Sequence, residues 1–342
     1  MIANTTGSFN AGMGYYAFGS NTTASYGAAL GYYALADNTT GTRNTASGYG
    51  ALKSNSTGGY NTAVGMSSMY RNTTAGYNTA VGTYSLYNNT TGTINVAVGF
   101  GALDSDTLGS NSVAVGYGTL ESQNFTTATN SFNTAVGFEA GHVITTGVKN
   151  TLIGGNSGDA LTDADFNVAV GNGSLSSDTL GSHSVALGHF ALRSQNFATA
   201  TDAYNVATGS QAGTAITTGI YNTLVGGLAG DALTDADNNV AVGRAALSSD
   251  TLGSGSIAIG RNALVAQNFT TATTSYNVAI GDLAGAAVTT ATSNTLVGGL
   301  AGDALTEGAR NVAVGTAALT NDTLGQYAVA IGYGALSTQN FT

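Results

Sequence analysis

A glycine recurs through the chain at a fixed spacing, and this repeat constrains the fold more than any other feature. It closes a five-residue phrase such as Asn-Thr-Ala-Val-Gly at residues 61–65, and the phrase returns every 17 residues except at three steps of 21. From Gly99 onward every 72 residues contain three steps of 17 and one of 21, which makes a 72-residue unit. Repeats this short, without a helical period, indicate coils stacked on one another. The sequence therefore predicts an all-β solenoid of about 19 coils.

The same repeat sets the domain organisation. A chain of 342 residues ordinarily suggests about two globular domains, but each coil of a solenoid needs only its neighbours. We expect one body over residues 1–342, with regular 17-residue coils in 1–99 and the 72-residue super-repeat in 100–342. The chain has 50 glycines and no proline, cysteine or tryptophan, so its stability must come from repetition rather than from disulfides or large core anchors.

The charge content argues against several classes of partner. Only 8% of the residues are charged and the net charge is −10, so we expect neither nucleic acid nor an anionic membrane surface as a partner. The sequence has no run of about twenty apolar residues, and its first residues lack the basic and apolar regions of a signal peptide. We therefore expect no membrane insertion.

We number the 17 positions of a coil from its asparagine, so that Asn61 is position 1 and Gly65 is position 5. Positions 2 and 4 carry mostly Val, Ile or Thr, as expected for a strand, and position 3 between them is nearly always alanine. Because the alanine is not polar, we expect both strand faces to be buried, with valine inside the coil and alanine facing another chain. This predicts a homotrimer whose interface includes Ala63, Ala80, Ala97, Ala114, Ala186 and Ala258.

The other positions of the coil have their own expected roles. A second strand is expected at the Ala-Leu pair of positions 8 and 9, as at residues 51–52, followed by a polar Asn-Thr-Thr-Gly turn. Glycine at position 5 suits a corner that needs positive φ or has no space for a Cβ. The asparagines at position 1, stacked about 4.8 Å apart, are expected to form an amide ladder.

Two stretches carry a family resemblance. Residues 109–116, Gly-Ser-Asn-Ser-Val-Ala-Val-Gly, resemble the head repeats of YadA-like trimeric autotransporter adhesins, and the Asn-Thr-Ala-Val-Gly form is similar to shaft repeats of bacteriophage tail fibres. The resemblance implies a trimer of left-handed parallel β-rolls that carries or performs attachment to a surface. It favours the shaft of a phage tail fibre, located in the virion or outside the cell. The alternatives are a bacterial adhesin head and a self-assembling extracellular filament in which copies stack end to end.

Aromatic side chains are the candidates for receptor contact. Tyr32 and Tyr33 lie in a tyrosine-rich, nearly uncharged part of the chain, which suits stacking on host cell-surface glycans. Phe125, Phe197 and Phe269 recur at one place in each 21-residue coil, where a receptor could contact them. The alternative interpretation of both groups is that the rings cover corners and pack against neighbouring coils or chains.

Little in the sequence suits catalysis or metal binding. Asp159, Asp163 and Asp165 form an acidic cluster that recurs in the next 72-residue unit, but no calcium-loop pattern surrounds it, so solvated turn residues are the default interpretation. The three histidines have no nucleophile in register with them. We therefore expect no metal, no cofactor and no enzyme activity. The threonine-rich turns leave ice binding as a distant third function.

Overall fold

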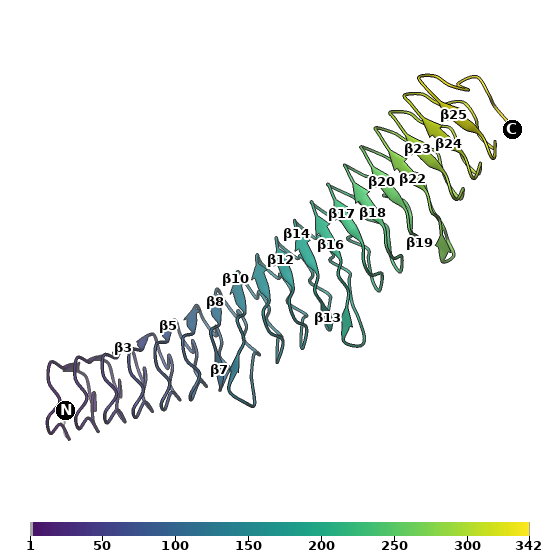
Figure 1. Cartoon of the computed structure of the whole chain (residues 1–342). Coiled ribbons are helices and arrows are strands. Elements are labelled where there is room, and N and C mark those ends of the chain that lie inside the picture. Colours follow the sequence, from purple (N-terminus) through teal and green to yellow (C-terminus); the bar gives the residue numbers. More distant parts are fainter. Residues whose placement is uncertain (1–2, 342) are drawn as a thin grey trace. The chain divides into compact units, whose positions relative to one another are not determined.

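The computed structural model describes residues 3–341. The chain divides into two compact units, Met1–Asn167 and Val168–Thr342, which are described separately. Each unit is a parallel β-solenoid whose coils follow one another along the chain, and the two units together have about 19 turns (Figure 1). No helix occurs in the described residues. The expected fold class, an all-β solenoid with 17- and 21-residue coils, is confirmed.

Unit 1 is built on one main strand per coil. Each main strand is three residues long and pairs with the strand one coil away in sequence. The strands pair in parallel with the same coil positions opposite each other, as in Thr62 against Thr79 and Ala63 against Ala80. The main strands are β1 (Ala11–Met13), β2 (Ala28–Leu30), β3 (Thr45–Ser47), β4 (Thr62–Val64), β5 (Thr79–Val81), β6 (Val96–Val98), β8 (Val113–Val115), β10 (Thr134–Val136) and β11 (Thr151–Ile153).

Unit 2 repeats this arrangement with richer β-branched content. Its register is the same, with Ala241 opposite Ala258 and Val242 opposite Ile259. Its main strands are β12 (Val168–Val170), β14 (Val185–Leu187), β16 (Val206–Thr208), β17 (Thr223–Val225), β18 (Val240–Val242), β20 (Ile257–Ile259), β22 (Val278–Ile280), β23 (Thr295–Val297), β24 (Val312–Val314) and β25 (Val329–Ile331).

The 21-residue coils form longer loops beside the main strands, as expected from their extra four residues. In each loop a short strand pairs in parallel with a short strand at the end of the preceding coil, and the loops project from the neighbouring coils in Figure 1. The pairs are β7 (Gly109–Ser110) with β9 (Thr129–Asn130), β13 (Gly181–Ser182) with β15 (Thr201–Asp202), and β19 (Gly253–Ser254) with β21 (Thr273–Thr274).

The alanine at position 3 points into the coil, which corrects the expected orientation of the strand. The side chains at positions 2 and 4 are half-buried or exposed, whereas the central alanine is fully buried within a single chain. The interface candidates are therefore interior residues of their own chain and cannot contact a second copy: Ala63, Ala80, Ala97, Ala114, Ala186 and Ala258 all have 0% exposure. A coil of 17 residues is too narrow to hold valines on both sides of its interior.

The narrow interior is filled by positions 3 and 9, which face each other. Most coils combine alanine at position 3 with a fully buried leucine at position 9, such as Ala97 with Leu103. Coil 150–166 reverses the sizes, with Leu152 at position 3 and Gly158 at position 9. A Cβ added to Gly158 would lie 2.8 Å from Leu152 Cδ2, so the two positions share one space. The same exchange recurs in unit 2 with Leu224 and Gly230.

The expected second strand at positions 8 and 9 is absent from the described residues. The chain turns there instead, and the residues at positions 7 and 9 adopt left-handed backbone conformations, such as Tyr33 at φ 58° and Leu35 at φ 50°. Left-handed leucine is uncommon because the Cβ crowds the backbone. The leucine is held there by its burial, since it supplies the large side chain that the small coil interior needs.

The corner glycine at position 5 meets both expected requirements. Gly65 has φ +134°, and a Cβ on it would lie 2.4 Å from the carbonyl oxygen of Gly82 in the next coil. The expected amide-to-amide bonds at position 1 occur in some coils, as from Asn222 Nδ2 to Asn205 Oδ1 at 3.2 Å. Position 1 bonds mainly to the backbone: the Oδ1 of Asn44 accepts from the backbone N–H of Asn61, and its Nδ2 donates to Gly58 O. A second amide ladder lies at position 12, as from Asn55 Nδ2 to Asn38 Oδ1 at 2.7 Å.

Candidate interaction surfaces

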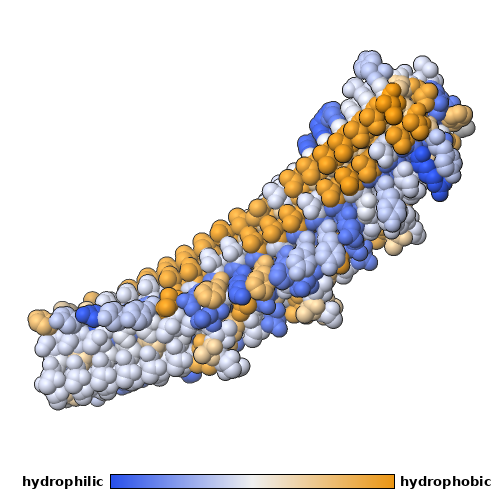
Figure 2. Space-filling view, viewed as in Figure 1, coloured by the Kyte–Doolittle hydropathy of each residue, from blue (hydrophilic) through white to orange (hydrophobic). Residues whose placement is uncertain are grey.

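The outer face of the main strands is the most continuous apolar surface in each unit. In unit 2 every residue at positions 2 and 4 is Val, Leu or Ile, except Thr208, Thr223 and Thr295. In unit 1 threonine and small residues are more frequent, and no charged side chain occurs at these positions. Figure 2 shows a hydrophobic band along the strands, and Val81 keeps 37% exposure although strands flank it on both sides. We call this surface the strand face.

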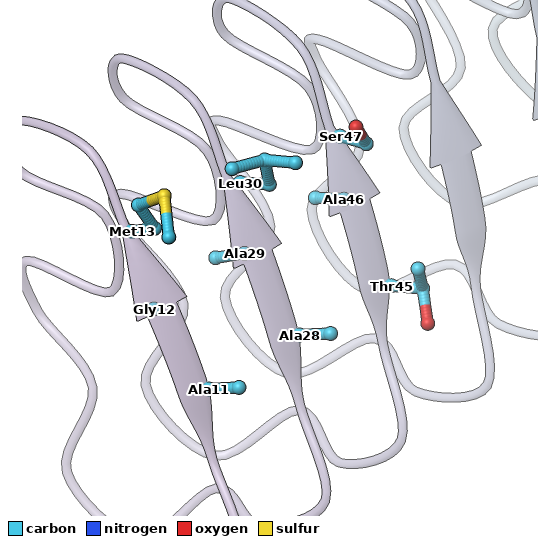
Figure 3. A pocket seen from close by; sticks show the side chains of 9 residues that line it. All are labelled: Ala11, Gly12, Met13, Ala28, Ala29, Leu30, Thr45, Ala46 and Ser47. Carbon is cyan, nitrogen blue, oxygen red and sulfur yellow. The ribbon is translucent and has the colours of Figure 1, made fainter.

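The first three coils of unit 1 hollow out the strand face. Alanine at position 2 of β1 and β2 and serine at position 4 of β3 leave a shallow cavity of about 400 Å³ (Figure 3). Met13 and Leu30 stand at one side of it, with 71% and 52% exposure. The cavity is apolar and contains no titratable group, so it offers hydrophobic contact and no chemistry.

Tyrosines form stacked columns beside the strand face in unit 1. The rings of Tyr15, Tyr32 and Tyr49 stack with centroid distances of 5.1 and 5.5 Å, and Tyr33 packs edge-on against Tyr32. A hydrogen bond with Tyr33 is the main cause that raises the pKa of Tyr32. Because both faces of the Tyr32 ring are covered by other rings, it offers its edge and hydroxyl, not a face on which a sugar could stack.

The phenylalanines of the 21-residue coils are buried, which corrects their selection as surface contacts. Phe125, Phe197 and Phe269 have 4%, 5% and 5% exposure. The backbone N–H of Phe269 donates to Asp250 Oδ1 at 3.0 Å, and a Cβ on Gly253 would lie 2.7 Å from the Phe269 ring. Each ring therefore closes the widened coil from within, in agreement with the alternative interpretation that it packs against neighbouring coils.

A buried polar network accompanies each of these rings and was not anticipated from the sequence. Gln123 Nε2 donates to Asp106 Oδ2 at 2.6 Å and to Ser112 Oγ at 3.0 Å, and Asn133 Nδ2 donates to Gln123 Oε1 at 2.8 Å. Burial raises the pKa of Asp106. The network recurs at 72-residue spacing around Gln195 and Gln267. The signal that could have revealed it is the replacement of position 12 asparagine by Asp and then Gln in successive coils.

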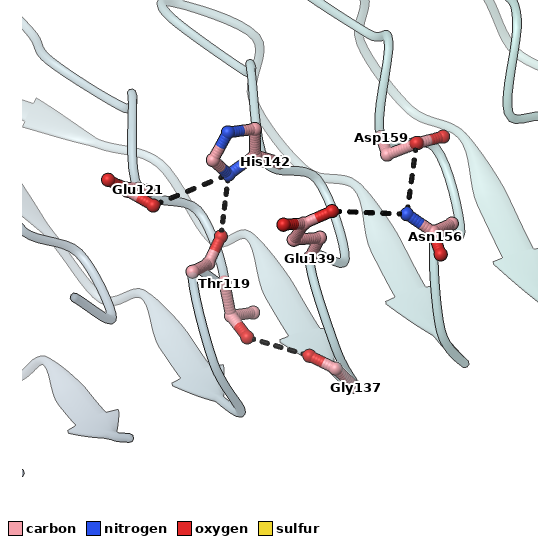
Figure 4. Close-up of polar contacts among 8 residues, drawn as sticks. Thr119, Glu121, Gly137, Glu139, His142, Asn156 and Asp159 are labelled. Atoms are coloured by element: carbon pink, nitrogen blue, oxygen red, sulfur yellow. Dashed lines mark hydrogen bonds and ion pairs between the residues drawn. The ribbon is translucent and has the colours of Figure 1, made fainter. Parts of the chain in front are cut away.

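A mixed acidic and histidine group lies on another side of unit 1 (Figure 4). His142 Nδ1 is 3.5 Å from Glu121 Oε2, and Asn156 Nδ2 donates to Glu139 Oε2 and Asp159 Oδ2 at 3.4 and 3.3 Å. Burial is the main cause that raises the pKa of Asp159. These contacts join neighbouring coils in pairs and do not converge on one point.

The acidic cluster proposed as a metal candidate is spread in the same way. Asp163 Oδ1 accepts from the Thr146 hydroxyl at 2.5 Å, and Asp165 Oδ1 accepts from the backbone N–H of Val148 at 2.7 Å. Both carboxylates thus link one coil to the preceding one. Across residues 3–341 no three His, Cys, Asp or Glu side chains are grouped so that they could hold a metal ion.

No helix within the described part of the chain is long and apolar enough to cross a membrane. No protein-family model matches the sequence, and no curated protein matches it.

Proposed function

We propose that the protein is a structural fibre and attachment protein that acts as a homotrimer, with its strand faces turned toward one another. The observation that carries this proposal is the strand face itself, a continuous uncharged band that remains exposed in a single chain. Contiguous apolar surface of this kind marks interaction sites in soluble proteins. The resemblance to tail-fibre shaft repeats supports a trimer of left-handed β-rolls in a virion or outside the cell.

The size of the strand face supports assembly through it. A three-residue strand is about 10 Å wide and coils are about 4.8 Å apart, so nine or ten coils present ~450 Å² in each unit. Each unit therefore supplies about half of the ~800 Å² per partner that stable interfaces bury. Because the band is uncharged at every coil, copies placed side by side around one axis can bury it within each unit.

The rest of the coil supports a structural role. Most side-chain amides, hydroxyls and buried carboxylates form hydrogen bonds from one coil to the next, such as Thr73 Oγ1 to Thr90 O at 3.0 Å. These bonds hold neighbouring coils together, which suits a structural role. We propose no catalytic role.

Light scattering on the purified chain tests the assembly. The native protein is expected at three times its chain mass of 33.8 kDa. Val242→Arg together with Ile259→Arg places charge in the strand face of unit 2 and is expected to give the mass of one chain. Ser249→Arg, on an exposed turn of the same unit, is the matched control and should leave the trimer intact. Open-ended polymers would favour the filament alternative, and a wild-type mass of one chain would refute the trimer.

The attachment role needs a separate test. Labelled trimer is incubated with intact cells, and an antibody against the chain is used to locate it in electron micrographs of the native particle. Decoration of a fibre supports the proposal. Labelling confined to the interior of the cell would contradict it.

A further inference from the structure

A hollow of about 360 Å³ lies on the face formed by coil positions 14 to 17 in unit 1, beside the strand face. We propose that this hollow, which we call the glycine groove, binds an acidic polysaccharide of the uronate-containing class. The inference deepens the attachment role proposed above, since it names the class of surface polymer that the fibre contacts.

Two glycines create the groove. Position 16 carries Ser8, Ser25 and Thr42 in the coils before it and Thr93 and Ser110 in the coils after it, but Gly59 and Gly76 in the two coils between. The missing side chains leave a depression between a column of threonines and a column of tyrosines. The groove therefore has a floor made of backbone.

That floor carries hydrogen-bond donors without acceptors. Where position 16 is serine, its hydroxyl accepts from the backbone N–H of position 16 in the preceding coil, as Ser25 Oγ does from Ser8 at 3.0 Å. Ser110 Oγ serves Thr93 in the same way at 2.9 Å. Thr42 and Gly59 are followed by glycine at position 16 of the next coil and so have no side-chain acceptor, while Gly76 is followed by Thr93, whose hydroxyl does not accept from it. No group in residues 3–341 accepts from these three N–H groups.

Unpaired donors of this kind favour an external acceptor. Gly76 is buried, and a buried N–H without a partner costs free energy comparable to a lost hydrogen bond. A ligand oxygen in the groove would remove that cost. The donors recur once per coil, so a linear polymer can satisfy several of them in succession, which a single small molecule cannot.

The chain itself shows that a carboxylate fits this place. In coils farther along, position 16 is aspartate, and Asp165 Oδ1 accepts from the Val148 N–H at 2.7 Å. Asp237 Oδ1 accepts from the Ile220 N–H at 2.8 Å in unit 2. A uronate carboxylate in the glycine groove would occupy the position that these side-chain carboxylates occupy in their own coils.

The walls of the groove suit the hydroxyls of a sugar. The hydroxyls of Thr39, Ser56 and Thr73 at position 13 donate to the next coil. The neighbouring Thr40, Thr57 and Thr74 at position 14 are exposed, and their hydroxyls bond to nothing in the described part of the chain. On the opposite wall Tyr60 and Tyr77 stack on each other at 4.8 Å and present their edges.

The charge around the groove favours an anion although the whole chain is acidic. Residues 1–99 contain three basic side chains, Arg43, Lys53 and Arg71, and one acidic side chain, Asp37, whereas the whole chain has a net charge of −10. Arg43 lies in the tyrosine column at the groove, with its guanidinium carbon 5.0 Å from the Tyr60 ring centroid. No carboxylate lines the groove. These features select an acidic polysaccharide over a neutral one.

Calorimetric titration of the full chain with an oligogalacturonate, and with maltohexaose as the neutral counterpart, tests the assignment. The wild type is expected to bind the acidic oligosaccharide saturably and more weakly at high salt, with at least tenfold weaker binding of maltohexaose. Gly59→Ser together with Gly76→Ser restores the side-chain acceptors and should weaken binding at least tenfold. Gly101→Ser, where a Cβ has no atom within 3.4 Å, is the matched control and should bind as the wild type does.

Thr57→Val provides a second variant that removes a groove hydroxyl without filling the groove, and it should weaken binding severalfold. Absence of saturable binding to the acidic oligosaccharide, equal binding of maltohexaose, or unchanged affinity in the double serine variant would each overturn the inference. Light scattering on the same samples separates this result from the proposed assembly. A trimer that binds no oligosaccharide would refute only the proposed binding in the glycine groove. A single chain that binds the oligosaccharide would refute only the proposed trimer.

Discussion

The exchange of sizes between Leu152 and Gly158 yields a double-mutant cycle that tests the coil interior. Leu152 is fully buried, and its neighbours at position 9 include glycine, which cannot move a side chain into vacated space. Leu152→Ala is therefore expected to cost ~3–4 kcal/mol, within the range for buried leucines that leave a cavity. Gly158→Ala alone should cost ~3 kcal/mol, since its Cβ meets Leu152 Cδ2 and Leu161 Cδ1 at 2.8 Å and its φ is +54°.

In the double variant the overpacking against Leu152 disappears, while the backbone cost at position 158 stays. The double variant should therefore lose ~1–2 kcal/mol less stability than the sum of the two single variants' losses. A coupling of this size is typical of residues that share one space. Native-state hydrogen exchange over residues 145–165 measures this locally, which matters because long repeat arrays lose two-state cooperativity. Single variants should open ~100-fold more often than the wild type. Additive costs would refute the placement of positions 3 and 9 opposite each other, and Leu224 with Gly230 offers a replicate.

Two further predictions concern the corner and the buried carboxylate. Gly65→Ala should lower the free energy of local opening by ~3 kcal/mol or more, because its Cβ would lie 2.4 Å from Gly82 O at φ +134°. Gly101→Ala, the comparison, should lower it by ~1 kcal/mol. Equal costs at the two sites would contradict this explanation. Burial raises the pKa of Asp106, so its contribution to stability is fully present below the unfolded pKa of about 4 and declines as pH rises through the folded pKa. Hydrogen exchange of the backbone amides near Asp106, measured against pH, should show this decline. Asp106→Asn should abolish the pH dependence, and its side-chain amide would then face the Nε2 of Gln123.

Much of the fold follows from the spacing of the repeat. The 17- and 21-residue steps predict parallel coils in register, and they are observed, as in Ala80 opposite Ala97. The invariant position 5 predicts a corner where only glycine fits, and Gly65 meets the next coil's carbonyl there. These features could be predicted because each depends on one position and its neighbour a fixed number of residues away.

The orientation of the strand could not be predicted from its alternation alone. A period of two shows that the faces differ, and the larger side chains at positions 2 and 4 favoured an interior of valine. The coil is so small that alanine opposite leucine fills it. The exchange of Leu152 with Gly158 in one coil carries this information, because two positions that trade volume must share a space.

The burial of the candidate phenylalanines could not be predicted for a related reason. Phe125 follows a polar turn in the sequence, so it looked exposed, but its coil is widened around the Asp106 and Gln123 network and needs a large side chain to close it. The left-handed conformation of Leu35 has no signal in the sequence, since leucine is not a residue that favours it. Tyr32 is exposed as expected, but the stacking of one coil on the next covers both faces of its ring.

Single cysteines at neighbouring positions of β5 test the central claim most directly, because the chain has no cysteine of its own. Ala80 has 0% exposure and Val81 has 37%, so Ala80→Cys places the thiol inside the coil and Val81→Cys places it on the strand face. After mild oxidation, Val81→Cys chains are expected to form disulfide-linked pairs on a denaturing gel, and Ala80→Cys chains are expected to remain single. Linked Ala80→Cys chains beside unlinked Val81→Cys chains would contradict both the orientation of the strand and the proposed assembly.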